Sequence, residues 1–394
     1  MRSSSAPASA DGRRRLLILT HFADLGGAEL ALLASVPRLA EEFDVRAAVP
    51  GHGPLIDRLR AMGVVVVDEP LPAARIAHDR LRSVRGALQL AIGMTRYVFR
   101  VKRLHQDWRP DLLYVNSLKS GLYGQALAVL WRRPWVWHMR DRLEVGYLGR
   151  SGVFGLRTLA ALGPRSLFAN ARGTLMLLPA RARRRTTVVF SPVDVASFSA
   201  LAETRRPCKH EAVRIAMIGR LTPIKGQHLL LEAVALASRT HQLRVRLIGG
   251  DLTTAGGQME ELTRLADSLG ITEHVEFTGH VADVAAALVD VDIVISYSQW
   301  PEPFGQTVIQ AMAAGLPVVA AAEGGPAELI DDGVTGVLVP PRDTKALAAA
   351  VTALADDPDR RARLATAGVV ASKRYSPDEV LPVLVATMRS ALRH

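Results

Sequence analysis

The residues best placed for chemistry follow the largely apolar run 291–295, which is typical of a buried parallel strand. Glu302 comes shortly after this run. From Phe304 onward, apolar residues recur at helical spacing until Gly315 ends the pattern. We therefore expect Glu302 on a loop at the carboxyl end of a strand, which is where open α/β sheets bind their ligands.

The start of the following helix would present free backbone N–H groups to a ligand. The groups near Gly305, Gln306 and Thr307 would face an anion. Gln310, about two turns beyond Glu302, could turn its amide toward the same crevice. The alternative, which the sequence leaves open, is an ordinary strand–helix turn whose glutamate is merely exposed.

Strand-like and helix-like segments alternate along the whole chain. Strands are expected at 16–19, 45–49, 64–67, 111–115, 135–137, 166–169 and 188–190, and again at 213–218, 244–248, 275–277, 291–295, 317–320 and 336–339. This alternation predicts α/β domains with parallel, doubly wound sheets. Gly26 and Gly27, between the first strand and its helix, have a geometry that can bring N–H groups against a phosphate, although a lone Gly-Gly turn is weak evidence.

Polar residues follow several strands of the first half. Asn116 comes after the strand 111–115, and His138, Arg140 and Asp141 come after the strand 135–137. The carboxyl ends of parallel strands share one edge of the sheet, so these side chains should gather at one rim. A lone histidine is more often structural, but the neighbouring Arg140 and Asp141 favour a functional interpretation of His138.

These patterns predict five segments along the chain. They are a disordered tail at 1–12, a first Rossmann-like domain at 13–194, a linker at 195–212, a second Rossmann-like domain at 213–375, and a closing helix at 376–394 that packs back on the first domain.

Composition describes a globular protein, with 49% hydrophobic and 22% charged residues. The single cysteine, Cys208, excludes an internal disulfide and fits a reducing compartment. The N-terminal region does not have the pattern of a signal peptide, and no run reaches the roughly 18 apolar residues of a spanning helix. We therefore expect a cytoplasmic protein.

Charge is unevenly distributed. Residues 1–209 hold 33 Lys or Arg against 16 Asp or Glu, a net charge of +17, whereas the remainder holds 16 against 22, a net charge of −6. The segment 75–109 is expected to form a long helix with a basic face. Aromatic residues at 5% and the lack of a recognised module argue against nucleic acid. Peripheral contact with anionic lipid at the inner face of the membrane is one explanation. The other two explanations are an ordinary solvated surface helix and the arginine-rich protein composition that is typical of GC-rich genomes.

Several motifs together resemble the retaining GT-B glycosyltransferases of family 4, the glycosyl transferases of group 1. The motifs are Gly219-Arg220, Lys225-Gly226, Glu302-Pro-Phe304-Gly305 with a polar residue at 310, and Gly26-Gly27-Ala-Glu29. The resemblance covers essentially the whole folded chain. It implies two Rossmann-like domains facing across a cleft, a nucleotide-sugar donor held mainly by the second domain and an acceptor held mainly by the first. It also implies retention at the anomeric carbon without a cofactor or an obligatory metal.

The resemblance gives Arg220 and Lys225 a role. A nucleotide-sugar loses a diphosphate, so negative charge grows on phosphate oxygens in the transition state. Arg220 offers a bidentate fork and Lys225 a point charge to stabilise that leaving group. Gly26 and Gly27 would let the first domain's backbone close on the same phosphate. The alternative is that both cations are ordinary surface charges.

Other residues match the family pattern or depart from it. Glu302 matches the glutamate that contacts hydroxyls of the donor sugar. His138 matches the active-site histidine, which is expected to hydrogen-bond the sugar near the reacting centre through its side chain or its backbone. Gln310 replaces the family's second glutamate, which grips the ribose, so we expect weaker donor binding or an altered nucleotide preference. The segment 190–194 also departs from the family pattern.

The resulting hypothesis is a hexosyl-type transferase with front-face departure and attack. The acceptor would be a cell-envelope glycan, a lipid-linked sugar or a small glycoside, with Asn116, Arg140 and Asp141 on the acceptor side. Two alternatives stay open: a nucleotide-sugar 2-epimerase on the same fold, and a non-catalytic nucleotide-sugar-binding protein.

Overall fold

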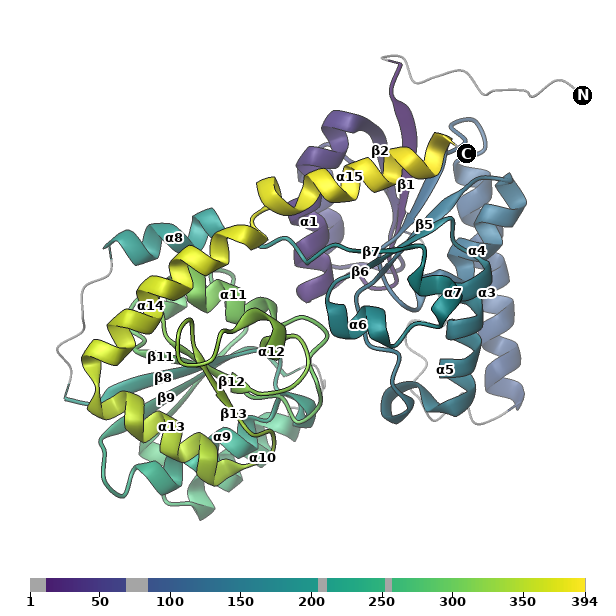
Figure 1. Cartoon of the computed structure of the whole chain (residues 1–394). Helices are drawn as coiled ribbons and strands as arrows, with labels where there is room; N and C mark the ends of the chain where they lie inside the picture. Colours follow the sequence, from purple (N-terminus) through teal and green to yellow (C-terminus); the bar gives the residue numbers. More distant parts are fainter. Residues whose placement is uncertain (1–11, 69–83, 205–210, 252–256, 394) are drawn as a thin grey trace, which may run out of the picture. The chain divides into compact units, whose positions relative to one another are not determined.

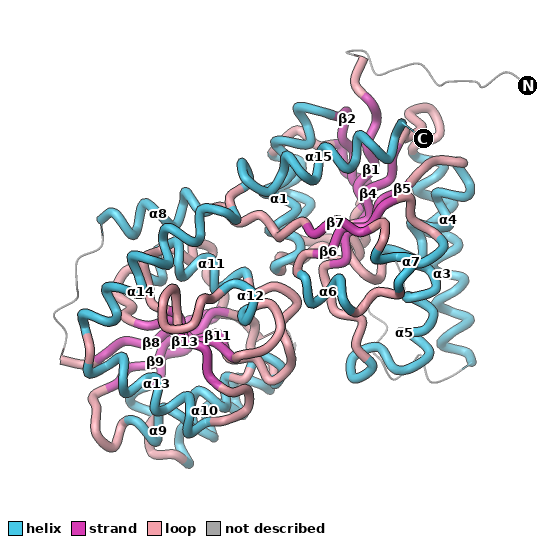
Figure 2. Tube along the Cα trace, in the orientation of Figure 1, coloured by secondary structure: helices cyan, strands magenta, loops and turns pink. Residues whose placement is uncertain are grey.

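The computed structural model describes residues 12–68, 84–204, 211–251 and 257–393. The chain divides into two compact units, one comprising Met1–Pro192 with Val380–His394 and the other Val193–Glu379 (Figure 1). Each unit has one parallel sheet with helices on its faces (Figure 2). The expected α/β class with two doubly wound domains is therefore confirmed.

The first unit has a seven-stranded sheet in the order β3-β2-β1-β4-β5-β6-β7. Its strands are β1 (Arg14–Leu19), β2 (Phe43–Ala48), β3 (Val65–Val67), β4 (Leu112–Val115), β5 (Trp135–Met139), β6 (Ser166–Ala169) and β7 (Thr186–Val188). All neighbouring pairs are parallel. The direction of winding reverses between β1 and β4, which makes the loops after these two strands the topological switch point.

Helices cover both faces of this sheet. They are α1 (Gly27–Glu42), α2 (Pro54–Ala61), α3 (Val84–Leu104), α4 (Ser120–Trp131), α5 (Val145–Leu162), α6 (Arg172–Met176) and α7 (Ala180–Arg183). Side chains alternate along β1, so Leu16 and Ile18 pack with α1 and α2, while Leu17 and Leu19 pack with α3 and α4. Helix α15 (Pro377–Arg393) contributes Leu384 and other apolar residues to the first of these cores.

The second unit has a six-stranded parallel sheet in the order β10-β9-β8-β11-β12-β13. Its strands are β8 (Val213–Ile218), β9 (Leu243–Ile248), β10 (Val275–Gly279), β11 (Ile293–Ser296), β12 (Val318–Ala321) and β13 (Val337–Val339). The helices are α8 (Val195–Thr204), α9 (Gln227–Ala237), α10 (Gly257–Ser268), α11 (Gln306–Ala313), α12 (Pro326–Leu329), α13 (Thr344–Asp356) and α14 (Pro358–Ser372). Here the winding reverses between β8 and β11.

The structure departs from the sequence predictions in three places. Strand β5 continues through Met139, so His138 lies inside the strand rather than beyond its end. Strand β7 comprises Thr186–Val188, two residues earlier than expected. Part of the expected linker, Val195–Thr204, is the helix α8, which packs on α11. These differences arise because local periodicity is weak in short segments, where tertiary contacts set the limits.

Other sequence predictions reach beyond the described residues. Of the expected basic helix at 75–109, the structure describes α3 from Val84 to Leu104, and residues 75–83 lie outside the described ranges. The predicted disordered tail, apart from Gly12, and Cys208 also lie outside them. Among the helices that the structure describes, none is both long and apolar enough to cross a bilayer.

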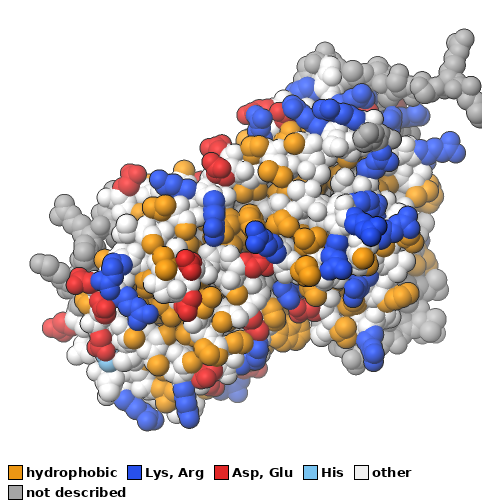
Figure 3. Space-filling model, in the orientation of Figure 1, with side chains coloured by type: hydrophobic (Ala, Val, Ile, Leu, Met, Phe, Trp, Pro, Cys, Tyr) orange, Lys and Arg blue, Asp and Glu red, His pale blue; other side chains and the backbone are white. Residues whose placement is uncertain are grey.

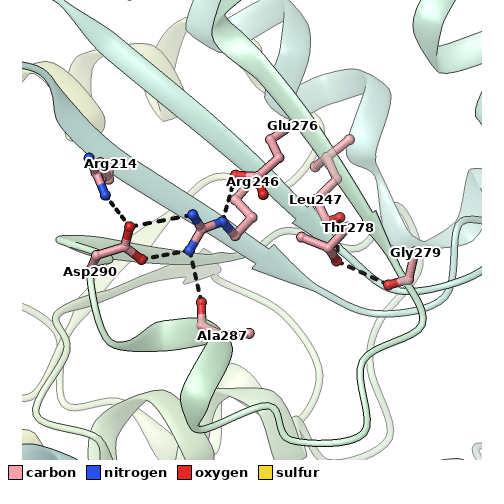
Figure 4. Close-up of polar contacts among 8 residues, drawn as sticks. All are labelled: Arg214, Arg246, Leu247, Glu276, Thr278, Gly279, Ala287 and Asp290. Carbon is pink, nitrogen blue, oxygen red and sulfur yellow. Dashed lines mark hydrogen bonds and ion pairs between the residues drawn. The ribbon is translucent and has the colours of Figure 1, made fainter.

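A network of ion pairs joins the first strands of the second unit (Figure 4). Arg246 on β9 donates to Glu276 on β10 at 2.8 Å and to Asp290 at 2.6 Å. Arg214 on β8 also donates to Asp290. Burial alone would raise the pKa of Asp290, but the two guanidinium groups hold it below its usual value. Asp290 therefore stays ionised and links β8 and β9 to the segment before β11.

Replacing Asp290 with Asn should lower the free energy of unfolding by about 1–2 kcal/mol, because two guanidinium groups lose a charged acceptor. The groups are partly exposed, so the loss should shrink in high salt. Urea unfolding at low and high NaCl measures both effects. The exposed Asp267→Asn variant is the control, and an equal loss in that variant would contradict a role for this network.

Candidate active site

Two loops meet at the switch point of the second unit. One follows β8 and carries Arg220 and Lys225, and the other follows β11 and carries Glu302. The two loops are joined by a backbone hydrogen bond of 2.8 Å from Gln299 N–H to the Ile224 carbonyl. The structure thus brings together the charged residues that the sequence singled out in this unit.

Lys225 and Glu302 form a direct contact. The Lys225 ammonium donates to Glu302 Oε1, and the Ser298 hydroxyl donates to the same oxygen. Burial by itself would raise the pKa of Glu302, but Lys225, Ser298 and the nearby Arg220 together hold it below its ordinary value. Glu302 is therefore an ionised acceptor beside a fixed cation. Ser298 was not among the predicted site residues, although it lies in the same loop.

Glycines make this close approach of loops possible. Gly226 has φ = 78°, and a Cβ there would lie 2.1 Å from the Tyr297 carbonyl oxygen. Gly249 has φ = 150°, and a Cβ there would lie 2.0 Å from the Gly219 carbonyl oxygen. Only glycine fits both the left-handed backbone and the lack of space at these positions. In the motif Lys225-Gly226, the lysine therefore provides the charge, and the glycine is required by the packing of the two loops.

Helix α11 begins at Gln306, directly after Glu302 and its loop. Gly305, with φ = 104°, is the N-cap and provides no side-chain cap, and Thr307 lies in the first turn. Phe304 is buried and packs edge-on against Tyr375 at 5.8 Å, which fixes the chain before the helix. Gln310 lies on the same helix and is only 8% exposed.

The Gly26-Gly27 turn lies at the switch point of the first unit. Gly26 is the N-cap of α1, and the carboxylate of Glu29 folds back toward it, since a Cβ on Gly26 would lie 3.0 Å from Glu29 Oε2. This is the glutamate half of a capping box, because Gly26 has no side chain that could cap the helix in return. Burial, the main cause, raises the pKa of Glu29 to about 7, and the nearby Asp141 adds to the effect.

A buried polar network lies beside this turn. The Arg140 guanidinium donates to Asn116 Oδ1 at 3.1 Å, to Ser191 Oγ at 2.9 Å and to the Tyr114 hydroxyl at 3.3 Å. The Tyr114 hydroxyl also contacts His138 Nδ1 at 2.8 Å. The sequence-predicted residues Asn116, His138 and Arg140 therefore do come together, joined by two residues that it did not single out.

Much of this network is buried. The His138 ring is fully buried and packs against Phe168. Burial, followed by the charge of Arg140, holds its pKa well below the ordinary value, so the imidazole is neutral. Asn116 and Arg140 are also buried, whereas Asp141 is half-buried. The His138 side chain thus positions the Tyr114 hydroxyl, and the expected contact of His138 with the donor sugar stays a prediction.

The described ranges contain no group of three or more His, Cys, Asp or Glu side chains arranged to hold a metal ion. The site consists instead of two cations, an ionised carboxylate, hydroxyl groups and the start of a helix. Such a set can bind a phosphorylated, hydroxyl-rich ligand.

Two doubly wound units with ligand-binding loops at a switch point define the GT-B class of glycosyltransferases, and solved structures of that class match this chain. The structure of Anabaena HepE in complex with UDP and glucose matches with a TM-score of 0.82 and 25% identity, covering 96% of this chain and 100% of that one. Sucrose-phosphate synthase from Thermosynechococcus elongatus shares the fold, with a TM-score of 0.78, 18% identity, and coverage of 96% of this chain and 99% of that one.

Sequence comparison gives the family. The model of the glycosyl transferases group 1 matches residues 204–369, and that of the glycosyl transferase 4-like domain matches residues 26–199. D-inositol 3-phosphate glycosyltransferase from Thermomonospora curvata is 30% identical over 306 residues, 70% of each chain. Glycogen synthase from Mycobacterium tuberculosis is 31% identical over 301 residues, 71% of this chain and 70% of that one. The chain belongs to the group 1 glycosyltransferases and is a transferase enzyme.

Replacing Gly226 with Ala should destabilise the protein by about 2–4 kcal/mol, because the new methyl group meets the Tyr297 carbonyl. Gly270→Ala is the matched control, since Gly270 has a similar φ of 69° and no atom within 4 Å of its Cβ position. That variant should lose only about 1 kcal/mol of backbone strain. Thermal unfolding of both variants measures the difference, and equal losses would mean that the loops do not need this close approach.

Glu29 should make stability fall as pH rises. Its pKa of about 7 in the folded protein exceeds the ordinary 4.5, so the folded state holds a proton that the unfolded state releases between these values. Below pH 4.5 the neutral Glu29 therefore contributes up to about 3 kcal/mol to the free energy of unfolding, and this contribution is lost by pH 7. Glu29→Gln keeps the capping geometry without titrating. Its unfolding temperature should rise relative to the wild type between pH 5 and pH 8, and a constant difference would contradict the raised pKa.

Proposed function

We propose that this enzyme transfers a sugar from a nucleotide-sugar donor to an acceptor with retention of the anomeric configuration. The observation that carries the proposal is the ion pair of Lys225 and Glu302 beside Arg220, at the switch point of the second unit. The relatives have the names of glycosyl-transferring enzymes, and HepE was solved with UDP, with UDP and glucose, and with UDP-glucose.

In this mechanism the second unit binds the donor diphosphate. Arg220, which is exposed, and Lys225 stabilise the charge that grows on the leaving phosphate, without a metal or other cofactor. The loop Gly219–Arg220 and the N–H groups at Gly305, Gln306 and Thr307 add dipoles directed at the same anion. Glu302 accepts hydrogen bonds from hydroxyls of the donor sugar, and Gln310 is proposed to contact the ribose.

The environment of Glu302 favours front-face substitution. A double displacement requires a carboxylate that attacks the anomeric carbon, but Glu302 has a lowered pKa and receives hydrogen bonds from Lys225 and Ser298, which make it a weak nucleophile. We propose instead that the bond to the leaving oxygen breaks as the acceptor oxygen bonds on the same face. The leaving phosphate oxygen then takes the acceptor's proton.

The acceptor is proposed to bind the first unit, near the half-buried Asp141 and the network of Arg140 and Asn116. Gly26 and Gly27 stay predicted contacts of the donor phosphate. The acceptor class that we propose comprises a sugar, a glycan or a lipid-linked sugar made at the cytoplasmic face of the membrane. A lipid-linked acceptor would bring the enzyme into peripheral contact with that membrane.

Incubation with radiolabelled UDP-, GDP- and ADP-sugars tests the proposal. Release or transfer of the sugar supports a transferase, and NMR of the product reports the anomeric configuration. Conversion to a different sugar nucleotide would instead support an epimerase. Binding without turnover of any donor in the presence of an acceptor extract would contradict the proposal.

Arg220→Ala and Lys225→Ala should each lower kcat by about 10²–10³, because each removes a charge that stabilises the leaving diphosphate. Arg239→Ala, an exposed arginine on the same unit, is the control and should leave kcat unchanged. Initial rates at saturating donor measure the effect. Near-normal kcat in both site variants would remove the proposed role of these cations.

A further inference from the structure

The segment 145–193 of the first unit is strongly basic and contains no Asp or Glu. Its arginines are Arg150, Arg157, Arg165, Arg172, Arg181, Arg183, Arg184 and Arg185. All of these except Arg185, which is half-buried and bonded to carbonyls of α5 and the turn that follows it, are exposed. A long stretch of one charge sign creates a potential that attracts an anionic partner.

Large apolar side chains are exposed on the same segment. Phe154 is 74% exposed, Leu162 63% and Met176 64%. Phe154 shares one face of α5 with Arg150 and Arg157, because these three residues recur at helical spacing, and Leu162 lines a groove together with them. Exposed apolar side chains that cluster on a soluble protein mark a surface that meets a partner.

Two of these apolar side chains and two of the arginines line a groove. A groove of about 560 Å³ is lined by α5 and the start of α7, with Phe154 and Leu162 among its apolar walls and Arg150 and Arg157 beside them. Figure 3 shows basic side chains with hydrophobic ones between them over the region of α6 and α7. The residues lining the groove include no carboxylate.

We propose that the α5–α7 surface docks on an anionic phospholipid bilayer. The arginines would contact lipid phosphates, while Phe154, Leu162 and Met176 enter the boundary between headgroups and acyl chains. This names the surface of the peripheral contact raised above, and it does not depend on the donor chemistry.

Two other assignments fit less well. A nucleic acid would match the charge, but a single-stranded chain needs several aromatic side chains on which bases stack, and Phe154 is the only exposed large aromatic residue in the described part of this surface. Helix α3 also has exposed arginines, Arg96 and Arg100, beside Phe99. Its basic face is followed by the acidic Asp107.

Sedimentation of the full-length protein with vesicles tests the proposal. Vesicles of phosphatidylcholine alone are compared with vesicles of equal parts phosphatidylcholine and phosphatidylglycerol, at low and high NaCl. The wild type should sediment with the anionic vesicles at least about tenfold more than with the neutral ones, and high salt should reduce the difference.

Variants locate the surface. Arg150→Glu with Arg157→Glu, Arg181→Glu with Arg183→Glu, and Phe154→Ser should each lower the partition onto anionic vesicles at least about tenfold. Two controls match them in chemistry on the second unit: Arg239→Glu with Arg264→Glu for charge, and the 67% exposed Val370→Ser for apolar surface. Both controls should bind as the wild type does. Thermal unfolding verifies that each variant is folded.

Several results would overturn the proposal. One is equal binding of the wild type to the two kinds of vesicle. Another is full binding by both folded charge-reversal variants of the α5–α7 surface, or loss only in Arg96→Glu with Arg100→Glu on α3. A third is tight binding of a fluorescent single-stranded oligonucleotide, abolished by the same variants, without vesicle binding. Sugar transfer to a soluble acceptor is measured separately, so failure of docking and failure of the enzymatic proposal are distinguishable.

Discussion

The site depends on the close approach of two loops in the second unit. Gly226 lies against the Tyr297 carbonyl, and this contact brings Lys225 to Glu302. A larger residue at 226 would separate the loops, and the cation would lose the carboxylate that holds it. Each member of the ion pair acts on the other. Lys225 keeps Glu302 ionised, and Glu302 holds the Lys225 ammonium in place near Arg220. In the mechanism proposed above, a diphosphate would therefore meet a cation that is already positioned, which lowers the cost of ordering the site on binding.

In the first unit, a cation, Arg140, is held in the protein interior. Arg140 is only 4% exposed, and its guanidinium donates hydrogen bonds to the neutral oxygens of Asn116, Ser191 and Tyr114. The neutral His138 ring contacts the Tyr114 hydroxyl through its Nδ1 atom. These residues follow or belong to neighbouring strands, so the network stiffens the edge of the sheet beside the Gly26-Gly27 turn. Rigid support of this kind suits the acceptor-binding role that we propose for this unit.

The uneven charge along the chain can be traced to particular parts of the structure. Eight arginines of the first half lie in the acid-free segment 145–193, which carries exposed apolar side chains, whereas Arg246 in the second half is paired with carboxylates. Paired charges stabilise a fold, while unbalanced charges attract a partner. The segment 145–193 and the network around Asp290 therefore differ in how carboxylates balance their arginines, and composition alone could not separate them.

The sequence by itself determined the alternation of strands and helices, the two doubly wound domains, the family, and the loops that contain Arg220, Lys225 and Glu302. These features are encoded locally, in hydrophobic period and in the glycines that interrupt it. Tertiary structure alone decided which groups touch. The burial of His138 follows from a strand that runs two residues further than its pattern indicates. The contacts of Ser298 with Glu302, and of Arg246 with Asp290, join side chains from different segments. Such contacts depend on strand order and loop packing, which no local pattern specifies.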